Sequence, residues 1–182
     1  MALIANNQLI VANVGDSRGV MCDAKGRTIE LSHDHKPHLA QERKRIKKAG
    51  GFITFNGVWR VAGVLATSRA IGDFPLKDRN FLIADPDIQV VDLDAEVRPE
   101  FVILATDGLW DAFSNEEAVM YIRERLDEPH FGAKSITLQA YYRGSLDNIT
   151  VMVINLKARN GSNGVKKTNV VKKNGVMKSK DV

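Results

Sequence analysis

The chain has 182 residues, of which 44% are hydrophobic, and this is enough for a domain with a sizeable apolar core. No apolar run in the sequence approaches the roughly 18 residues that a membrane-spanning helix requires. A single cysteine, Cys22, excludes an internal disulfide bond and fits a reducing compartment, so we expect an intracellular protein of the cytoplasm or nucleus.

The positive charge of the chain is concentrated at its carboxy-terminal end. The net charge is +4, whereas residues 158–182 alone hold seven Lys and Arg against one Asp, which leaves residues 1–157 at −2. A slightly acidic body argues against a nucleic-acid-binding groove. Residues 1–157 are the expected folded domain, and residues 158–182 predict a basic disordered tail, with nuclear targeting or an anionic-surface contact as the alternative.

The first half of the chain predicts closely spaced strands and one helix. Residues 2–32 contain three or four short strands, and such close spacing implies antiparallel hairpins. Their turns are expected at Asn6-Asn7, Gly15-Asp16 and Ala24-Lys25-Gly26. Residues 37–51 predict an exposed helix that ends at Gly50-Gly51, and residues 52–68 return to strands and turns.

The second half predicts two strands, two helices and a final strand, over residues 85–94, 100–106, 114–128, 132–142 and 148–156. The first of these helices has the clearest signal, because Ser114 and Glu117 can form a capping box. Its apolar stripe consists of Ala118, Ile122 and Leu126. The order of elements predicts an α+β fold with mainly antiparallel sheets.

Three aspartates stand at predicted strand ends. Asp107 follows the apolar residues 101–105, Asp147 precedes the last strand, and Asp34 follows an early one. Carboxylates brought together repel one another, and a hard cation such as Mg²⁺ or Mn²⁺ removes that repulsion. Each of these aspartates also fits an ordinary turn, since Asp-Gly and Asp-Asn are common turn pairs, so both interpretations stay open at this point.

Other polar residues suggest chemistry less strongly. The loop histidines His33, His35 and His38 do not have the spacing of a structural zinc site, and Cys22 has no evident activating neighbour.

Two further positions allow a structural or a functional interpretation. Asp16 fits a turn in which its side chain bonds its own backbone. Arg69 and Asp73 are close enough in sequence to support a substrate flap or to form an internal ion pair.

Six segments in order carry a resemblance to a known family. They are "VANVGDSRGV", "DHKP", "ERKRIKKAGG", "LATSRAIGDF", "ILATDGLWDAFSNEEAV" and "RGSLDNITVMV", and they span nearly all of residues 1–157. Together they resemble the metal-dependent protein phosphatases of the protein phosphatase 2C family, and their sequences look closest to its epsilon-like branch.

The resemblance implies a fold and an activity. The fold would be a pair of packed antiparallel sheets, a β-sandwich, flanked by helices. The activity would be hydrolysis of phosphoserine and phosphothreonine in phosphoprotein substrates, by a water activated at a centre of two Mg²⁺ or Mn²⁺ ions. No catalytic residue is identified beyond the metal ligands, and we expect a monomer without specific nucleic-acid binding.

Site residues follow from the same resemblance. Asp107 and Asp147 match carboxylates of the two-metal centre, and Asp34 matches a ligand of a third, weaker metal site shared with Asp107. Gly108 would permit a sharp exit of the chain beside the metals. The supporting residues are Gly108, Asn148, Asp16, Arg69 and Asp73.

The family pattern is incomplete in this sequence. The family's "DGHGG"-type loop, its further acidic ligands and its phosphate-contacting arginine have no counterpart here. We therefore expect a carboxy-terminal portion of the enzyme, truncated on the amino-terminal side, with little or no activity alone. Any membrane association would belong to a longer parent protein.

Two other interpretations compete with a metal-dependent phosphatase. The first is a non-catalytic regulatory fragment that binds phosphatase substrates or partners. The second is a haloacid-dehalogenase-type phosphatase, suggested by the letters "DLD" at residues 92–94, but that chemistry needs a parallel sheet and the hairpin-rich context disfavours it.

Overall fold

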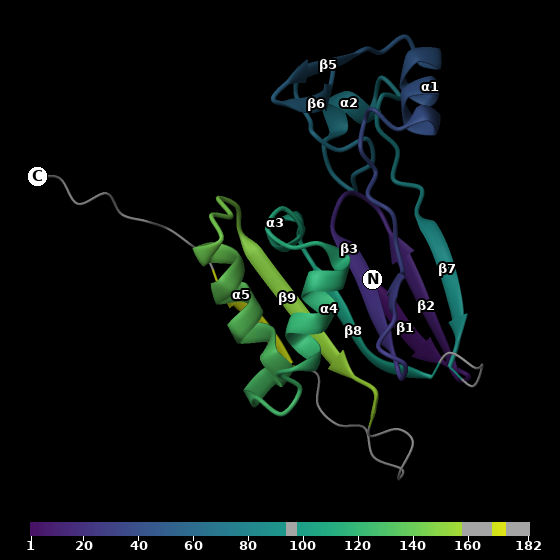
Figure 1. The fold of residues 1–182 in the computed structure, drawn as a ribbon. Helices are drawn as coiled ribbons and strands as arrows, with labels where there is room; N and C mark the ends of the chain where they lie inside the picture. Colours follow the sequence, from purple (N-terminus) through teal and green to yellow (C-terminus); the bar gives the residue numbers. More distant parts are fainter. Residues whose placement is uncertain (94–97, 158–168, 174–182) are drawn as a thin grey trace, which may run out of the picture. The chain divides into compact units, whose positions relative to one another are not determined.

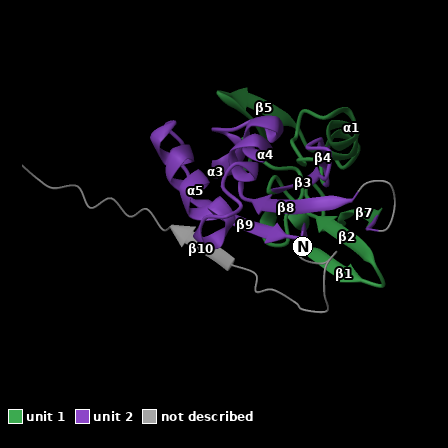
Figure 2. Ribbon diagram, turned by 60° about the horizontal axis from the view of Figure 1, so that its bottom comes forward, with its two compact units in different colours: residues 1–17, 32–91 green, residues 18–31, 92–182 purple. Residues whose placement is uncertain are grey.

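The computed structural model describes residues 1–93, 98–157 and 169–173. The chain forms two compact units, each built from two stretches of sequence (Figure 2). Unit 1 contains residues 1–17 and 32–91, and unit 2 contains residues 18–31 and 92–182.

Unit 2 is organised around a sheet in the order β10-β9-β8-β3-β4, in which every neighbouring pair is antiparallel. Figure 1 labels β9, β8 and β3 of this sheet. The strands are β3 (Arg18–Asp23), β4 (Thr28–Glu30), β8 (Pro99–Ala105), β9 (Ile149–Asn155) and β10 (Asn169–Lys173). The central strand β8 is rich in β-branched and aromatic residues and is buried on both faces, which suits a pleated, fully covered position.

Helices cover one face of this sheet (Figure 1). They are α3 (Asp107–Trp110), α4 (Asn115–Arg123), the 3₁₀ turn η1 (Pro129–Gly132) and α5 (Ala133–Tyr142). Phe101 and Ile103 of β8 point to the helices and are fully buried, together with Ile122 of α4 and Ile136 of α5. The apolar residues that alternate along the strand and those spaced i, i+4 on the helices therefore pack into one core.

Helix α4 begins with the predicted capping box. The Ser114 hydroxyl accepts a hydrogen bond from the Glu117 backbone N–H, and the Glu117 carboxylate accepts one from the Ser114 N–H at 2.9 Å. These two bonds satisfy backbone donors that a helix start otherwise leaves unpaired. The predicted stripe of Ala118, Ile122 and Leu126 is buried in the core of unit 2.

Unit 1 contains two small sheets and two helices. Strands β1 (Ala2–Ala5), β2 (Gln8–Asn13) and β7 (Asp87–Asp92, whose last residue is counted in unit 2) form one sheet, and β5 (Ile53–Asn56) pairs with β6 (Val58–Val61) in a hairpin. The helices are α1 (Ala40–Lys48) and α2 (Phe74–Lys77).

The β1–β2 hairpin turns at the predicted residues. Asn6 and Asn7 both have positive φ, 47° and 60°, which the primed hairpin turns require and which asparagine tolerates better than most residues. Around α1 the buried apolar residues are few, namely Ile46, Val61 and Leu82. Partly buried side chains such as Ile53 and Phe81 surround them.

The predicted α+β fold class with antiparallel sheets is confirmed by these elements. The short helices α2 and α3 were not predicted, because four-residue helices leave no periodic pattern. The exposed-helix prediction for residues 37–51 is partly wrong: Glu42 and Ile46 of α1 are buried, whereas Leu39 is 41% exposed. A polar residue therefore occupies the inward face of this helix.

The predicted tail is only partly open to description. Residues 158–168 and 174–182 lie outside the described residues, so the prediction of disorder there stays a prediction. Within the segment, Asn169–Lys173 forms β10 and pairs with β9 from Asn169↔Val153 to Lys173↔Ile149. The sequence "NVVKK" carries two β-branched residues, and β9 offers it an antiparallel edge.

Helix length bears on the membrane question. The longest described helix, α5, has 10 residues, about half of what a bilayer requires, and none of the helices among the described residues could span a membrane.

Candidate functional site

Asp107 and Asp147 lie at the same edge of the sheet in unit 2. Strands β8 and β9 are antiparallel, with Ala105 paired to Val151, so the end of β8 meets the beginning of β9. Asp107 follows β8 by two residues and opens α3, and Asp147 precedes β9 by two residues. The sequence prediction brought these two aspartates together, and the strand pairing does the same.

Hydrogen bonds on both sides of Asp107 connect it to the segment that carries Asp147. The Thr106 hydroxyl donates to the Asn148 carbonyl oxygen at 3.1 Å and accepts from the Thr150 N–H at 3.0 Å. On the other side, the Ser145 hydroxyl donates to the Gly108 carbonyl oxygen at 2.7 Å. The two aspartates are therefore held by backbone and hydroxyl contacts between neighbouring residues.

Gly108 allows these segments to approach closely. A Cβ atom at this position would lie 2.6 Å from the Asn148 carbonyl oxygen, closer than real Cβ atoms come to any atom, and 3.2 Å from the Asn148 carbonyl carbon. The expected reason, a sharp exit made possible by glycine's backbone freedom, is wrong, because Gly108 has no positive φ and lies inside α3. It is the missing side chain that matters, since it leaves room for the Asn148 backbone.

Both carboxylates accept a hydrogen bond from the next residue. Oδ1 of Asp107 accepts from the Gly108 N–H at 3.0 Å, and Oδ1 of Asp147 accepts from the Asn148 N–H at 2.6 Å. Asp107 is half-buried and Asp147 is exposed. Such oxygen donors suit Mg²⁺ or Mn²⁺. Across residues 1–93 and 98–157, however, no three or more His, Cys, Asp or Glu side chains form a group that could hold a metal, so this edge supplies two candidate ligands.

Asp34 and Asp16 belong to unit 1. Asp34 is half-buried, and its carbonyl oxygen accepts from the Lys36 N–H at 3.1 Å. Its sharing of a metal with Asp107 stays a prediction. The carboxylate of Asp16 accepts from Lys36 Nζ at 2.6 Å, so in place of the expected bond to its own turn backbone the structure has an ion pair between the loop after β2 and the segment before α1.

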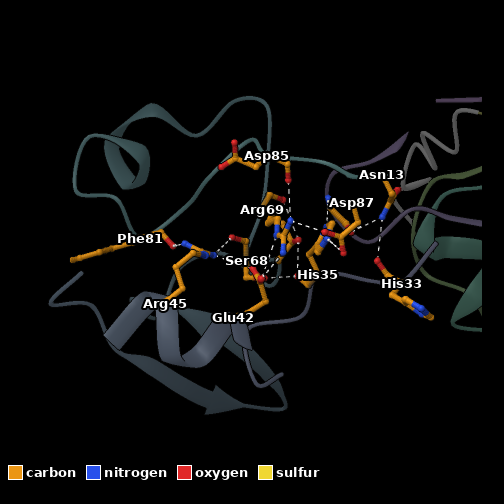
Figure 3. Close-up of polar contacts among 12 residues, drawn as sticks. Asn13, His33, His35, Glu42, Arg45, Ser68, Arg69, Phe81, Asp85 and Asp87 are labelled. Atoms are coloured by element: carbon orange, nitrogen blue, oxygen red, sulfur yellow. Dashed lines mark hydrogen bonds and ion pairs between the residues drawn. The ribbon is translucent and has the colours of Figure 1, made fainter. Parts of the chain in front are cut away.

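Arg69 forms the centre of a buried ionic network in unit 1 (Figure 3). Its guanidinium donates to Glu42 Oε1 from Nη2 at 2.7 Å and from Nε at 3.2 Å. Its Nη1 donates to Asp87 Oδ1 and to the Asp85 carbonyl oxygen, each at 2.9 Å. Arg69 therefore joins α1 to β7, and its ion-pair partners are Glu42 and Asp87.

Glu42 is 4% exposed and its carboxylate is fully engaged. Besides Arg69, it accepts hydrogen bonds from Arg45 Nη2 at 2.9 Å and from the Ser68 hydroxyl at 2.7 Å. Burial alone would raise the pKa of Glu42, but the hydrogen bonds from Arg69, Ser68 and Arg45 outweigh it and lower the pKa to about 2. The charged form is thus the stable one inside this network.

His35 and Asp87 extend the network (Figure 3). The Gly15 N–H donates to Nδ1 of His35 at 3.1 Å, so Nδ1 carries no proton and Nε2 must carry it. Nε2 of His35 then donates to Asp87 Oδ2 at 3.1 Å. For Asp87, burial would raise the pKa, but the hydrogen bond from His35 and the attraction of Arg69 lower it.

This network was not predicted from the sequence. Glu42 was read as part of an exposed helix, and His35 as one of three loop histidines. The i, i+4 spacing of Glu42 and Ile46 was the available signal, because both residues lie on the inward face of α1.

The remaining candidates are Asp73 and Cys22. Asp73 is exposed and has a left-handed φ of 59° before α2. Cys22 is fully buried in the core of unit 2; burial, with the nearby Glu100 carboxylate, raises the pKa of its thiol to about 12. It is therefore an unreactive thiol, in line with the sequence interpretation.

Comparisons with known proteins agree with one another. The family described as Protein phosphatase 2C matches residues 1–149. Over 162 residues the chain is 67% identical to Protein phosphatase 1L of Bos taurus, covering 89% of this chain and 44% of that protein. Over 177 residues it is 48% identical to Probable protein phosphatase 2C 59 of Arabidopsis thaliana, covering 97% of this chain and 55% of that protein.

Solved structures give the same result. A phosphatase from a pathogenic strain of Toxoplasma gondii matches with a TM-score of 0.76 and 29% identity, over 92% of this chain and 52% of that one. A structure described as a C. elegans sex determining protein matches with a TM-score of 0.73 and 27% identity, over 83% of this chain and 37% of that one.

This chain belongs to the protein phosphatase 2C family. It spans about half the length of the curated relatives given above, 44% of one and 55% of the other.

Proposed function

We propose that this chain is part of a metal-dependent protein serine/threonine phosphatase, and that Asp107 and Asp147 are two of its metal ligands. The observation that carries this proposal is the sheet edge where β8 ends and β9 begins. There the segments that carry the two carboxylates are held together by contacts of Thr106 and Gly108 with Asn148. Family membership supports the reaction class, hydrolysis of phosphoserine and phosphothreonine in phosphoproteins.

The residues at this edge would hold Mg²⁺ or Mn²⁺ through carboxylate oxygens. Bound ions of this kind supply an activated water and neutralise charge on the phosphoryl group. The chain's own contribution is position. Asp107 sits on a helical turn fixed by Thr106 and Ser145, and Asp147 shares that support through Asn148. Rigid ligand placement of this kind is what a two-metal site requires.

Asp34 is proposed as a ligand of a third, weaker metal site. It is half-buried in the segment after β4. The supporting residues Asn148 and Gly108 act through the backbone, whereas Arg69 and Asp16 hold unit 1 together through their ion pairs with Glu42 and Lys36. The carbonyl oxygen of Asp73 accepts from the Leu76 and Lys77 N–H groups of α2, and its supporting role stays a prediction.

We further propose that the chain alone is inactive or weakly active. Among the described residues, two carboxylates reach the β8–β9 edge, fewer than a complete ligand set for two ions. The second candidate function follows from this: a non-catalytic regulatory fragment that binds phosphatase substrates or partners without hydrolysing them.

Metal binding tests the site directly. Calorimetric titration of the full chain with Mn²⁺ should give weak binding, and Asp107→Asn and Asp147→Asn should each reduce the affinity by about tenfold or more. Asp111→Asn is the matched control, because Asp111 is an exposed carboxylate at the end of the same helical turn. An equal loss of Mn²⁺ affinity in Asp111→Asn and Asp107→Asn would contradict the proposal.

Hydrolysis separates the two candidate functions. A phosphothreonine peptide with millimolar Mn²⁺ should be hydrolysed by a longer form carrying the additional residues of a full-length relative, and hardly at all by this chain. Asp107→Asn should abolish the activity of the longer form. If the short chain matched the longer one in rate, incompleteness would be wrong. If the short chain bound the peptide without turnover, the regulatory function would be favoured.

A further inference from the structure

Charge is distributed very unevenly over the folded part of the chain. Residues 36–83, which include α1, the β5–β6 hairpin and α2, hold ten Lys and Arg against three Asp and Glu, a net charge of +7. Since residues 1–157 together carry −2, the rest of that stretch carries −9. The overall charge of the chain hides a strongly basic region within unit 1.

Four of these cations form an exposed stripe on α1. Arg43, Lys44, Lys47 and Lys48 are all exposed, and their i, i+1, i+4, i+5 spacing puts them on one side of the helix. Glu42 and Ile46 are the buried residues of the same helix. The stripe therefore faces away from the apolar cluster of Ile46, Val61 and Leu82.

No acidic residue among the described ones forms an ion pair with the stripe. The only acid on α1, Glu42, is buried and engaged by Arg45 and Arg69. Like charges four residues apart, as in Arg43 and Lys47, destabilise a helix. Lys47 and Lys48 gain from the negative end of the helix dipole, but Arg43 and Lys44 lie too early in the helix for that. Helix stability therefore does not explain the four charges.

The neighbouring hairpin also leaves apolar side chains uncovered. Phe55 is 62% exposed and Val58 is 47% exposed, at the turn between β5 and β6. The ring of Trp59 lies 5.2 Å from that of Phe55 and 6.3 Å from that of His38, just before α1, so the hairpin borders the beginning of the helix. Uncovered charge and uncovered apolar surface occur together in this region.

We propose that the stripe of Arg43, Lys44, Lys47 and Lys48 is a docking surface for an acidic segment of a partner protein. The helix is about 13 Å long, which matches about four residues of an extended peptide. A nucleic-acid site typically neutralises about 6–10 phosphates, more than the four cations of this stripe can supply, whereas four cations suit a short acidic segment. This inference goes beyond the proposed phosphatase function and uses none of its metal ligands.

Peptide binding in the absence of metal tests the docking surface. The probe is a fluorescein-labelled twelve-residue peptide rich in Asp and Glu, titrated with the full chain in EDTA at about 50 mM salt. Wild type should bind it, and the variant Arg43→Gln/Lys44→Gln/Lys47→Gln/Lys48→Gln should bind about tenfold more weakly, because four exposed charge contacts are lost. Because the assay needs neither metal nor turnover, its failure leaves the phosphatase proposal untouched.

The matched control removes the same charge elsewhere. The variant Lys166→Gln/Lys167→Gln/Lys178→Gln/Lys180→Gln also loses four cations, from the basic carboxy-terminal segment, and should weaken binding by less than about threefold. Lys44→Arg/Lys47→Arg/Lys48→Arg keeps the charge and should bind like wild type. If the fourfold glutamine variant fails to fold, the pair Lys44→Gln/Lys48→Gln decides, with an expected loss of about threefold.

Three results would overturn the proposal. The first is wild type failing to bind the acidic peptide. The second is the tail variant losing as much affinity as the α1 variant. The third is a single-stranded oligonucleotide, or vesicles of phosphatidylserine, binding more tightly than the peptide through the same four residues.

Discussion

The core of unit 2 and the α1 region of unit 1 are held together by different forces. Around β8 the buried residues are almost all apolar, with Phe101, Ile103 and Ile122 at no exposure. Around α1 only three apolar residues are buried, and a network centred on Glu42 and Arg69 supplies the remaining contacts. Apolar burial has no direct dependence on pH, whereas buried ion pairs depend on the charge of each partner.

This difference matches what each region is proposed to do. The carboxylates at the β8–β9 edge rest on a rigid apolar core, which fixes their position. The basic stripe lies on α1, a helix that ion pairs attach to the rest of unit 1. Acid should therefore unfold the α1 region before the core of unit 2. The following predictions test the contrast, from the largest expected effect to the smallest.

Phe101→Ala should destabilise the chain by about 3–5 kcal/mol, because it opens a cavity in the core of unit 2. Phe55→Ala is the control of the same chemistry in unit 1, and its effect should stay within about 1 kcal/mol since Phe55 is 62% exposed. Urea denaturation followed by circular dichroism measures both. Equal losses from the two substitutions would contradict the contrast.

Glu42→Gln should destabilise the α1 region by about 2–3 kcal/mol. The substitution leaves the guanidinium groups of Arg45 and Arg69 without their buried counter-charge. Glu116→Gln, an exposed acid in the first turn of α4, should change stability by less than about 0.5 kcal/mol. Hydrogen exchange of the α1 amides is the measurement, and unchanged protection in Glu42→Gln would show that the network adds no stability.

Gly108→Ala should destabilise unit 2 by about 1–3 kcal/mol, because the new methyl group meets the Asn148 carbonyl oxygen. Gly72→Ala is the matched control in unit 1: a Cβ there meets nothing within 4 Å, so this substitution should be neutral or slightly stabilising. Thermal denaturation compares the two. The proton NMR resonances of Asp107 and Asp147 should shift in Gly108→Ala and not in Gly72→Ala.

The smallest effect concerns pH. Folding lowers the pKa of Glu42 from 4.5 to about 2, so its contribution is fully present above pH 4.5 and is lost as pH falls toward 2. Between pH 7 and pH 4, wild type should therefore lose about 1 kcal/mol more than Glu42→Gln. Identical pH profiles for the two proteins would mean that Glu42 has an ordinary pKa in the folded state.

Much of the fold could be predicted from local patterns. The strands of unit 2 alternate or run continuously apolar, and α4 carries its start signal in Ser114 and Glu117. The pair Asp107 and Asp147 could be found because each stands beside an apolar strand. Their position at the same edge then follows from the antiparallel pairing of β8 with β9. Hairpin-rich sequences favour antiparallel pairing.

The remaining features depend on contacts between distant residues. The buried carboxylate of Glu42 depends on Ser68 and Arg69, 26 and 27 positions away, and no local sequence pattern predicts these partners. Gly108 was explained by backbone freedom because its neighbour in space, Asn148, lies 40 positions later in the chain. Side-chain complementarity across the fold, and not hydropathy, determines both.

The two tryptophans provide a separate optical signal for each unit. Trp110 is 8% exposed, donates its indole N–H to the Ala105 carbonyl oxygen at 3.0 Å, and lies beneath the Arg18 guanidinium at 5.2 Å. Trp59 lies on the β5–β6 hairpin of unit 1 and is only partly buried. An indole in an apolar setting emits at shorter wavelength than one in contact with water. Emission from Trp59→Phe therefore follows unit 2 alone, and emission from Trp110→Phe follows unit 1, so the melting of each unit can be observed in the same chain.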